Sequence, residues 1–207
     1  MMSFMRRVLP HEPDVIGLLV AQLEMTVAGM AALVEWAAGE PDQDQAVRDI
    51  EHETDERKRT LWLALRDAFV TPLAPEDLFF MSARIDVVLG EAKDLVRESE
   101  AIDTPPDEAM HEMAQALAES VGYLLDACLA FRGGRTSFAT ATAAADAAHK
   151  AARAVEPRYR SAMAALLALD DRRRVARYRE SYHRMSRMGI DLIEVAERVW
   201  YVAVKES

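Results

Sequence analysis

An acidic helical segment, Ile50-Glu51-His52-Glu53-Thr54-Asp55, is followed one helix length later by the turn Phe69-Val70-Thr71-Pro72, and this stretch decides the fold. Glu51 and Asp55 are four residues apart, so on a helix both carboxylates lie on one face, about 5–6 Å apart at Cβ. Such a pair can chelate one metal ion or line one pocket. It can equally belong to a solvated acidic face, because further carboxylates crowd the same turns.

Prolines divide the rest of the chain into long segments with helical periodicity. Apolar residues recur at spacings of three, four and seven through 47–68 and again through 76–100. Glycine is scarce, with 8 residues in 207, and no sustained alternation of β-branched residues predicts a strand. We expect six helices in an all-α bundle made of two three-helix repeats. The expected segments are 15–38, about 47–68, 76–100, 107–131, 137–169 and 171–204, with Pro157 kinking or splitting the fifth.

Composition predicts one soluble, cytoplasmic domain over residues 1–207, with repeat one at about 10–103 and repeat two at about 105–205. The chain is 51% hydrophobic and 29% charged, and its single cysteine, Cys128, falls in an apolar helical run where a buried structural thiol is expected. The segment 15–38 is apolar enough to raise the question of a membrane span. Glu24 and Glu35 argue against a span, and no signal peptide is evident.

The net charge of −10 is unevenly distributed along the chain. Residues 1–104 hold 21 acidic and 10 basic side chains, whereas residues 105–207 hold 14 acidic and 15 basic ones. An acidic half disfavours nucleic acid and anionic membranes as partners, and it favours cations.

Asp86 is expected to join the first carboxylate pair. Asp55 precedes Thr71 by 16 residues and Asp86 follows it by 15, so an antiparallel hairpin brings the two level. Three carboxylates from two helices suit a divalent or ferric ion. Ion pairing with Arg84, Lys58 or Arg59 is an equally open interpretation.

A rival pattern uses histidine. Glu108 and His111, and again Glu180 and His183, show the Glu-x-x-His spacing of di-iron helical bundles. The two motifs start at different depths in their helices, with an expected axial offset of roughly 12–14 Å. That offset is too large for one metal pair.

The acidic pair, the Phe69-Val70-Thr71-Pro72 turn, the Glu76-Asp77 pair and Ile85-Asp86 together resemble the PhoU-like family, in the group termed domain of unknown function 47. The resemblance covers essentially the whole chain. It implies two three-helix repeats, and metal clusters held by paired Glu/Asp-x-x-x-Asp motifs. Carried onto this sequence, it assigns Glu51, Asp55 and Asp86 as the metal ligands of the first repeat.

The sequence departs from the family pattern at the remaining ligand positions. Gly90 stands where a fourth acidic ligand is expected in the first repeat. In the second repeat, Arg160 and Arg187 replace acidic ligands. We therefore expect Glu156, Arg160, Arg187 and Asp191 to form a metal-free ion-pair cluster, and any metal at the first site to bind weakly or partially.

The resemblance implies a non-enzymatic regulator or accessory protein of inorganic phosphate transport. Its implied partner is a low-affinity phosphate permease at the cytoplasmic face of the membrane. Apolar exposure on the first helix would add a homodimer. Two alternatives stay open on the sequence: a di-iron metalloenzyme and a metal-free helical scaffold.

Overall fold

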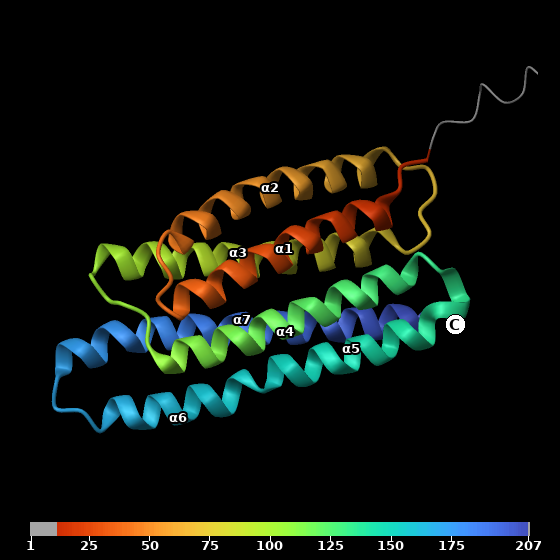
Figure 1. Cartoon of the computed structure of the whole chain (residues 1–207). Helices are drawn as coiled ribbons and strands as arrows, with labels where there is room; N and C mark the ends of the chain where they lie inside the picture. The colour runs from red at the N-terminus through yellow and green to blue at the C-terminus, as the bar shows by residue number, and fades with distance from the viewer. Residues whose placement is uncertain (1–11, 207) are drawn as a thin grey trace, which may run out of the picture.

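The computed structural model describes residues 12–206, and it is an elongated all-α bundle (Figure 1). No strand occurs within the described residues. The helices are α1 (Val15–Ala37), α2 (Gln43–Asp67), α3 (Pro75–Ala101), α4 (Glu108–Phe131), α5 (Phe138–Arg153), α6 (Val155–Leu167) and α7 (Arg172–Lys205), with a short 3₁₀ turn, η2 (Gly134–Ser137), before α5. The prediction of an all-α bundle is confirmed.

The helices form two groups of three rods, with α5 and α6 together forming one rod. In the first group α2 packs on α1 and α3, and in the second the α5–α6 rod packs on α4 and α7. The groups meet where α1 contacts α4 and α3 contacts α7. The first rods of the two groups therefore lie against each other, as do the third rods, and one connected set of buried apolar side chains runs through both groups.

The buried faces of α2 and α3 follow the predicted periodicity. Val47, Thr54 and Leu61 are the buried residues of α2. On α3 the buried apolar residues are Leu78, Met81, Ile85, Val88, Leu89, Ala92, Leu95 and Val96. Because one stripe of each helix is apolar, the opposite faces and edges are left for charged side chains.

Helix α1 is long and apolar enough to cross a membrane by length and composition alone. In the structure 56% of its most apolar window is buried inside the protein, and it contacts α2, α3 and α4. Core helices of soluble proteins pass the same test. Its place in the bundle is that of a core helix.

The fifth rod is divided at Ala154, three residues before Pro157. Proline has no N–H to bond the carbonyl of Arg153, four residues earlier, and its ring crowds that carbonyl. Gly189 of α7 lies against this break, where an added Cβ would stand 3.3 Å from Val155 Cβ and 3.4 Å from the Ala152 carbonyl oxygen. A glycine therefore lets α7 approach the divided rod closely.

Cys128 is fully buried on α4. Burial raises the pKa of its thiol to about 12. Because the thiolate is the reactive form, this cysteine is a structural residue, as expected from the sequence.

Candidate carboxylate site between α2 and α3

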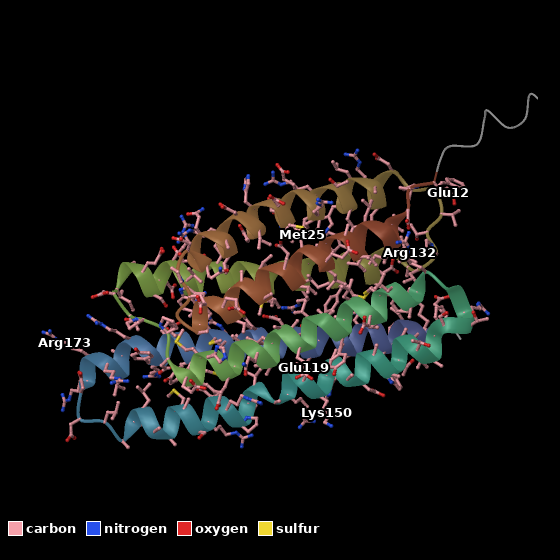
Figure 2. All side chains as sticks on the ribbon, viewed as in Figure 1. Glu12, Met25, Glu119, Arg132, Lys150 and Arg173 are labelled. Carbon is pink, nitrogen blue, oxygen red and sulfur yellow. The ribbon has the colours of Figure 1, made fainter. Side chains whose placement is uncertain are left out.

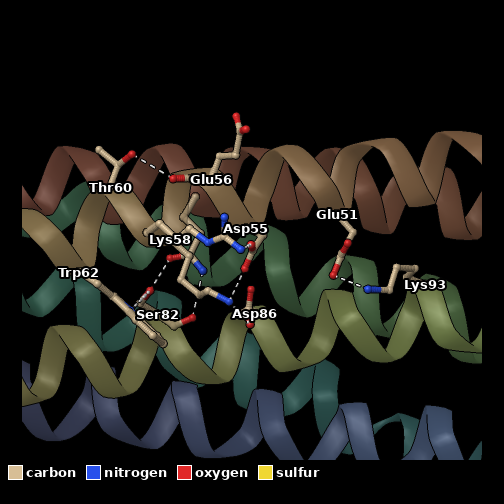
Figure 3. Close-up of polar contacts among 11 residues, drawn as sticks. Glu51, Asp55, Glu56, Lys58, Thr60, Trp62, Ser82, Asp86 and Lys93 are labelled. Carbon is tan, nitrogen blue, oxygen red and sulfur yellow. Dashed lines mark hydrogen bonds and ion pairs between the residues drawn. The ribbon is translucent and has the colours of Figure 1, made fainter.

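Asp55 on α2 and Asp86 on α3 lie level across the helix pair, as the hairpin count predicts. Lys58 stands between them (Figure 3). Its Nζ lies 2.6 Å from Asp55 Oδ1 and 2.8 Å from Asp86 Oδ2. The Lys58 side chain is only 13% exposed, so one partly buried ammonium occupies the space where two carboxylates converge.

A second cation completes the pairing of Asp55. Arg59 Nη2 lies 2.6 Å from Asp55 Oδ2, so each oxygen of this carboxylate contacts one positive group. The hydrogen bond from Lys58 lowers the pKa of Asp55 below its ordinary value, against a smaller opposing effect of burial, and the charge of Arg59 acts in the same direction as the hydrogen bond. Asp55 is therefore held as a carboxylate.

Lys58 is also held charged. Burial is the largest single influence on its pKa and acts to lower it. The hydrogen bonds and charges of Asp55 and Asp86 together outweigh burial and raise the pKa of Lys58 above its ordinary value. The three groups thus form a carboxylate–ammonium–carboxylate bridge between α2 and α3.

Glu51, the third predicted ligand, pairs with a different lysine. Its Oε1 accepts a 2.6 Å hydrogen bond from Lys93 Nζ on α3 (Figure 3). Gly90, where the family pattern expects another acid, faces open space, since an added Cβ would meet no atom within 4 Å. Glu51 and Lys93 therefore form a second ion pair between α2 and α3, separate from the bridge made by Lys58.

A buried polar network fixes the position of this helix pair against the core. Trp62 Nε1 donates to Ser82 Oγ at 3.1 Å, and Ser82 Oγ donates to Gln22 Oε1 on α1 at 2.6 Å. Gln22 Nε2 returns a hydrogen bond to the Ser82 carbonyl at 3.0 Å. Because both Gln22 and Ser82 are fully buried, the network sets the register of the three helices of the first group.

The donor set does not fit a resident metal ion in this arrangement. No group of three or more acidic, histidine or cysteine side chains within residues 12–206 is placed to hold a metal. Of Glu51, Asp55 and Asp86, the structure brings only the two aspartates together, and it places an ammonium between them. In this arrangement the three predicted ligands form two ion-pair bridges, with Lys58 and Lys93 standing where a cation would bind, and the metal site stays a prediction.

The four residues of the expected cluster in the second group contact different partners. Glu156 Oε1 and Arg160 Nε form a 2.8 Å pair along α6, and both side chains are at least half exposed. Arg187 instead contacts Glu91 of α3 at 3.4 Å, and Asp191 accepts from Arg84 of α3 at 2.9 Å. The four residues divide into a surface pair and two contacts between the groups, because this edge of α7 faces α3.

Arg184 of α7 is the most buried arginine in the ion pairs between the two groups, and it was not among the residues expected from the sequence. Its side chain is 10% exposed, and its guanidinium bridges Glu91 and Glu98 of α3, with Nη2 lying 2.5 Å from Glu98 Oε1. Farther along the same seam, Arg198 Nη1 lies 2.8 Å from the buried carboxylate of Asp77, and its guanidinium lies 4.2 Å from the Phe80 ring centroid. The sequence signal that could have indicated these contacts is the spacing of the arginines along α7.

The two Glu-x-x-His motifs do not form one centre. His111 bonds Gln115 on its own helix at 2.8 Å. His183 lies 3.0 Å from the Tyr159 hydroxyl of α6. His183 also accepts a 3.5 Å hydrogen bond from Arg179. The two imidazoles lie in different regions with no carboxylate partner shown, and no group of three metal-ligating side chains occurs within residues 12–206.

The α2–α3 turn presents apolar side chains outward. Leu73 is buried, and Thr71 Oγ1 donates to the Leu73 carbonyl at 2.6 Å, which closes the turn just before Pro75 begins α3. Phe69 is 93% exposed and Val70 is 57% exposed. The turn is therefore anchored by one residue and displays two others.

No model of a known protein family matches the chain, and no curated protein matches its sequence. Solved structures do match. A PhoU-like protein from Shewanella oneidensis MR-1 aligns with a TM-score of 0.75 over 93% of this chain and 100% of that one, at 14% identity. The chain has the PhoU-like fold.

A putative PhoU-like phosphate regulatory protein from the same organism aligns nearly as well, with a TM-score of 0.74, 14% identity and the same coverage. At this identity the likeness establishes the fold alone. The resemblance inferred from the acidic pair and the Phe69 turn is thus confirmed for the PhoU-like architecture, and the ligand set remains a prediction that this arrangement of side chains does not favour.

Proposed function

We propose that this protein is a non-enzymatic regulatory or accessory protein of inorganic phosphate transport, which acts by contacting a phosphate permease. The observation that carries the proposal is the PhoU-like fold, which the chain shares over 93% of its length with a structure described as a putative phosphate regulatory protein. Neither structural neighbour is described as an enzyme.

The geometry of the carboxylate site supports a role through contacts. A metal ion could bridge carboxylates to a phosphate anion, because it reverses the local potential. Here Lys58 and Lys93 already neutralise the carboxylates that such an ion would need. Both lysines join α2 to α3, so the site stabilises the helix pair that carries the Phe69–Val70 turn.

That turn is the contact surface that we assign to the partner. Phe69 is almost fully exposed, so its ring contributes little to folding, and exposed aromatic side chains are frequent anchors at protein interfaces. The partner segment we propose is a cytoplasmic part of the permease with an apolar pocket for this ring.

Co-purification from the native host tests the proposal. Wild-type protein and a control with two exposed apolar residues changed elsewhere, Leu63→Ser with Ile190→Ser, should both recover a phosphate permease. The variant Phe69→Ser with Val70→Ser should fold normally and recover none. Deleting the gene should change phosphate uptake, and the wild-type gene should restore it.

Two results would contradict the proposal. Unchanged uptake together with no recovered permease would favour the scaffold alternative. An iron-dependent absorption band with oxygen-dependent turnover in purified protein would favour the enzyme alternative.

A further inference from the structure

An arginine-rich surface stands at the end of the bundle where α6 passes into α7, in a protein that is otherwise acidic. Between residues 172 and 179 the chain carries five arginines and no acidic residue: Arg172, Arg173, Arg174, Arg177 and Arg179. All five are exposed. Figure 2 shows Arg173 at the extremity of the molecule, pointing away from the helices.

These arginines differ from those in the interior seams in having no carboxylate partner. Arg174 lies 5.4 Å from the Tyr178 ring centroid, Arg177 donates to the Asp103 carbonyl at 3.4 Å, and Arg179 donates to His183 at 3.5 Å. Within residues 12–206 none of the five is ion-paired. By contrast, Arg84, Arg184 and Arg198 each contact a carboxylate across the seam between α3 and α7.

A cleft and an apolar tip accompany the charge. Arg173, Arg174 and Arg177 line a cleft of about 560 Å³, together with Thr104 and Tyr178. Asp103 and Asp171 also line the cleft, and Asp171 accepts hydrogen bonds from the backbone N–H groups of Arg173 and Arg174. Leu167 and Leu169, in the last turn of α6 and the loop after it, are 63% and 43% exposed.

We propose that this end, defined by the five arginines with Leu167 and Leu169, docks the protein on an anionic phospholipid surface. Guanidinium groups pair with lipid phosphates in a forked geometry, and the two leucines enter the region below the headgroups. The rest of the molecule is acidic and is repelled by the same surface, so the protein attaches by this end. The expectation that anionic membranes are disfavoured rests on the acidic first half of the chain, and this surface belongs to the second half.

Docking in this way leaves the Phe69–Val70 turn at the opposite end of the bundle (Figure 1). A helix of 27 residues, such as α3, spans about 40 Å. To contact this turn, a membrane partner would then need a domain that extends about 40 Å from the bilayer. The membrane contact itself is independent of the proposed role in phosphate transport.

Vesicle sedimentation with the full chain tests the proposal. We expect binding to vesicles that contain phosphatidylglycerol, weakening as salt is raised, and no binding to pure phosphatidylcholine vesicles. Arg173→Glu with Arg177→Glu should weaken binding roughly 25-fold or more, since each basic residue at an anionic surface contributes about fivefold. Leu167→Ser with Leu169→Ser should weaken it about tenfold.

Matched controls separate this surface from general charge and apolarity. Arg135→Glu with Arg153→Glu gives the same net charge away from the arginine end, and Leu63→Ser with Ile190→Ser removes the same kind of exposed apolar groups. Both controls should bind like wild type. Equal losses in test and control variants would overturn the proposal, as would inorganic phosphate binding at these arginines without any vesicle binding.

Discussion

Two aspartates from the predicted sites of the two halves, Asp55 and Asp191, have opposite electrostatic environments. In the first half, Asp55 contacts two cations, Lys58 and Arg59, and its pKa is lowered. In the second, Asp191 contacts Arg84, yet burial and the neighbouring Glu194 and Glu91 raise its pKa. Asp55 is neutralised within the α2–α3 pair, whereas Asp191 contacts an arginine of the other group.

The comparison explains the charge asymmetry of the sequence. Acidic residues of α3, namely Glu91, Glu98 and Asp77, are met by Arg184 and Arg198 of α7. The acidic first half and the more basic second half are therefore complementary at their common seam.

The largest expected effect comes from removing the seam arginine. Arg184→Ala should lower the free energy of unfolding by about 2–3 kcal/mol, because it leaves Glu98 without its charged donor and Glu91 with only the 3.4 Å contact from Arg187. Arg187→Ala is the control on the same helix, and its half-exposed 3.4 Å contact should contribute about 0–1 kcal/mol. Urea unfolding measures both, and equal losses would contradict the difference drawn between them.

Removing the bridging lysine should have the next largest effect. Lys58→Met keeps the apolar stem beside Trp62 and removes the ammonium, so we expect a loss of about 1–2 kcal/mol in the free energy of unfolding. Lys150→Met, an exposed lysine of α5, gives the same change in net charge and should be nearly neutral. A neutral Lys58→Met would show that the bridge does not stabilise the pair.

The two aspartates should respond to pH with opposite signs. The pKa of Asp55 is lowered on folding, so its contribution is complete above the ordinary value of 3.8 and is lost as pH falls through the lower folded value. The pKa of Asp191 is raised, so its ionisation reduces stability as pH rises from 3.8 through the higher folded value. Unfolding curves across acidic pH for Asp55→Asn and Asp191→Asn should therefore diverge from wild type in opposite directions. Parallel curves would refute this.

The smallest expected effect is a gain. Gly90→Ala should stabilise α3 by about 0.5–1 kcal/mol, because the position is helical and an added Cβ meets nothing within 4 Å. A midpoint shift in urea measures it. A loss of stability would mean that the site between Asp86 and Lys93 is more crowded than the structure shows.

Much of the fold was predictable because it depends on periodicity. The apolar stripes of α2 and α3 and the break near Pro157 follow from local chemistry, and counting from Thr71 placed Asp55 level with Asp86. The side-chain partners were harder. Lys58 lies one turn after Asp55 in the sequence, but its choice of both aspartates depends on the distance between two helices.

The second half shows the same limit more clearly. The family resemblance placed Arg187 and Asp191 beside Glu156 and Arg160. Helical spacing alone cannot say which neighbour an edge of α7 meets. Packing turns that edge to α3 instead. The exposed Phe69 was recognised as part of a motif, but its outward direction depends on the burial of Leu73.

Metal titration of wild type beside Lys58→Ala tests most directly whether an ammonium replaces the cation at the carboxylate site. With manganese or ferric iron followed by calorimetry, wild type should show no binding that depends on Asp55, whereas Lys58→Ala should gain binding that Asp55→Ala then abolishes. Metal bound by wild type and lost in Asp55→Ala alone would contradict the account.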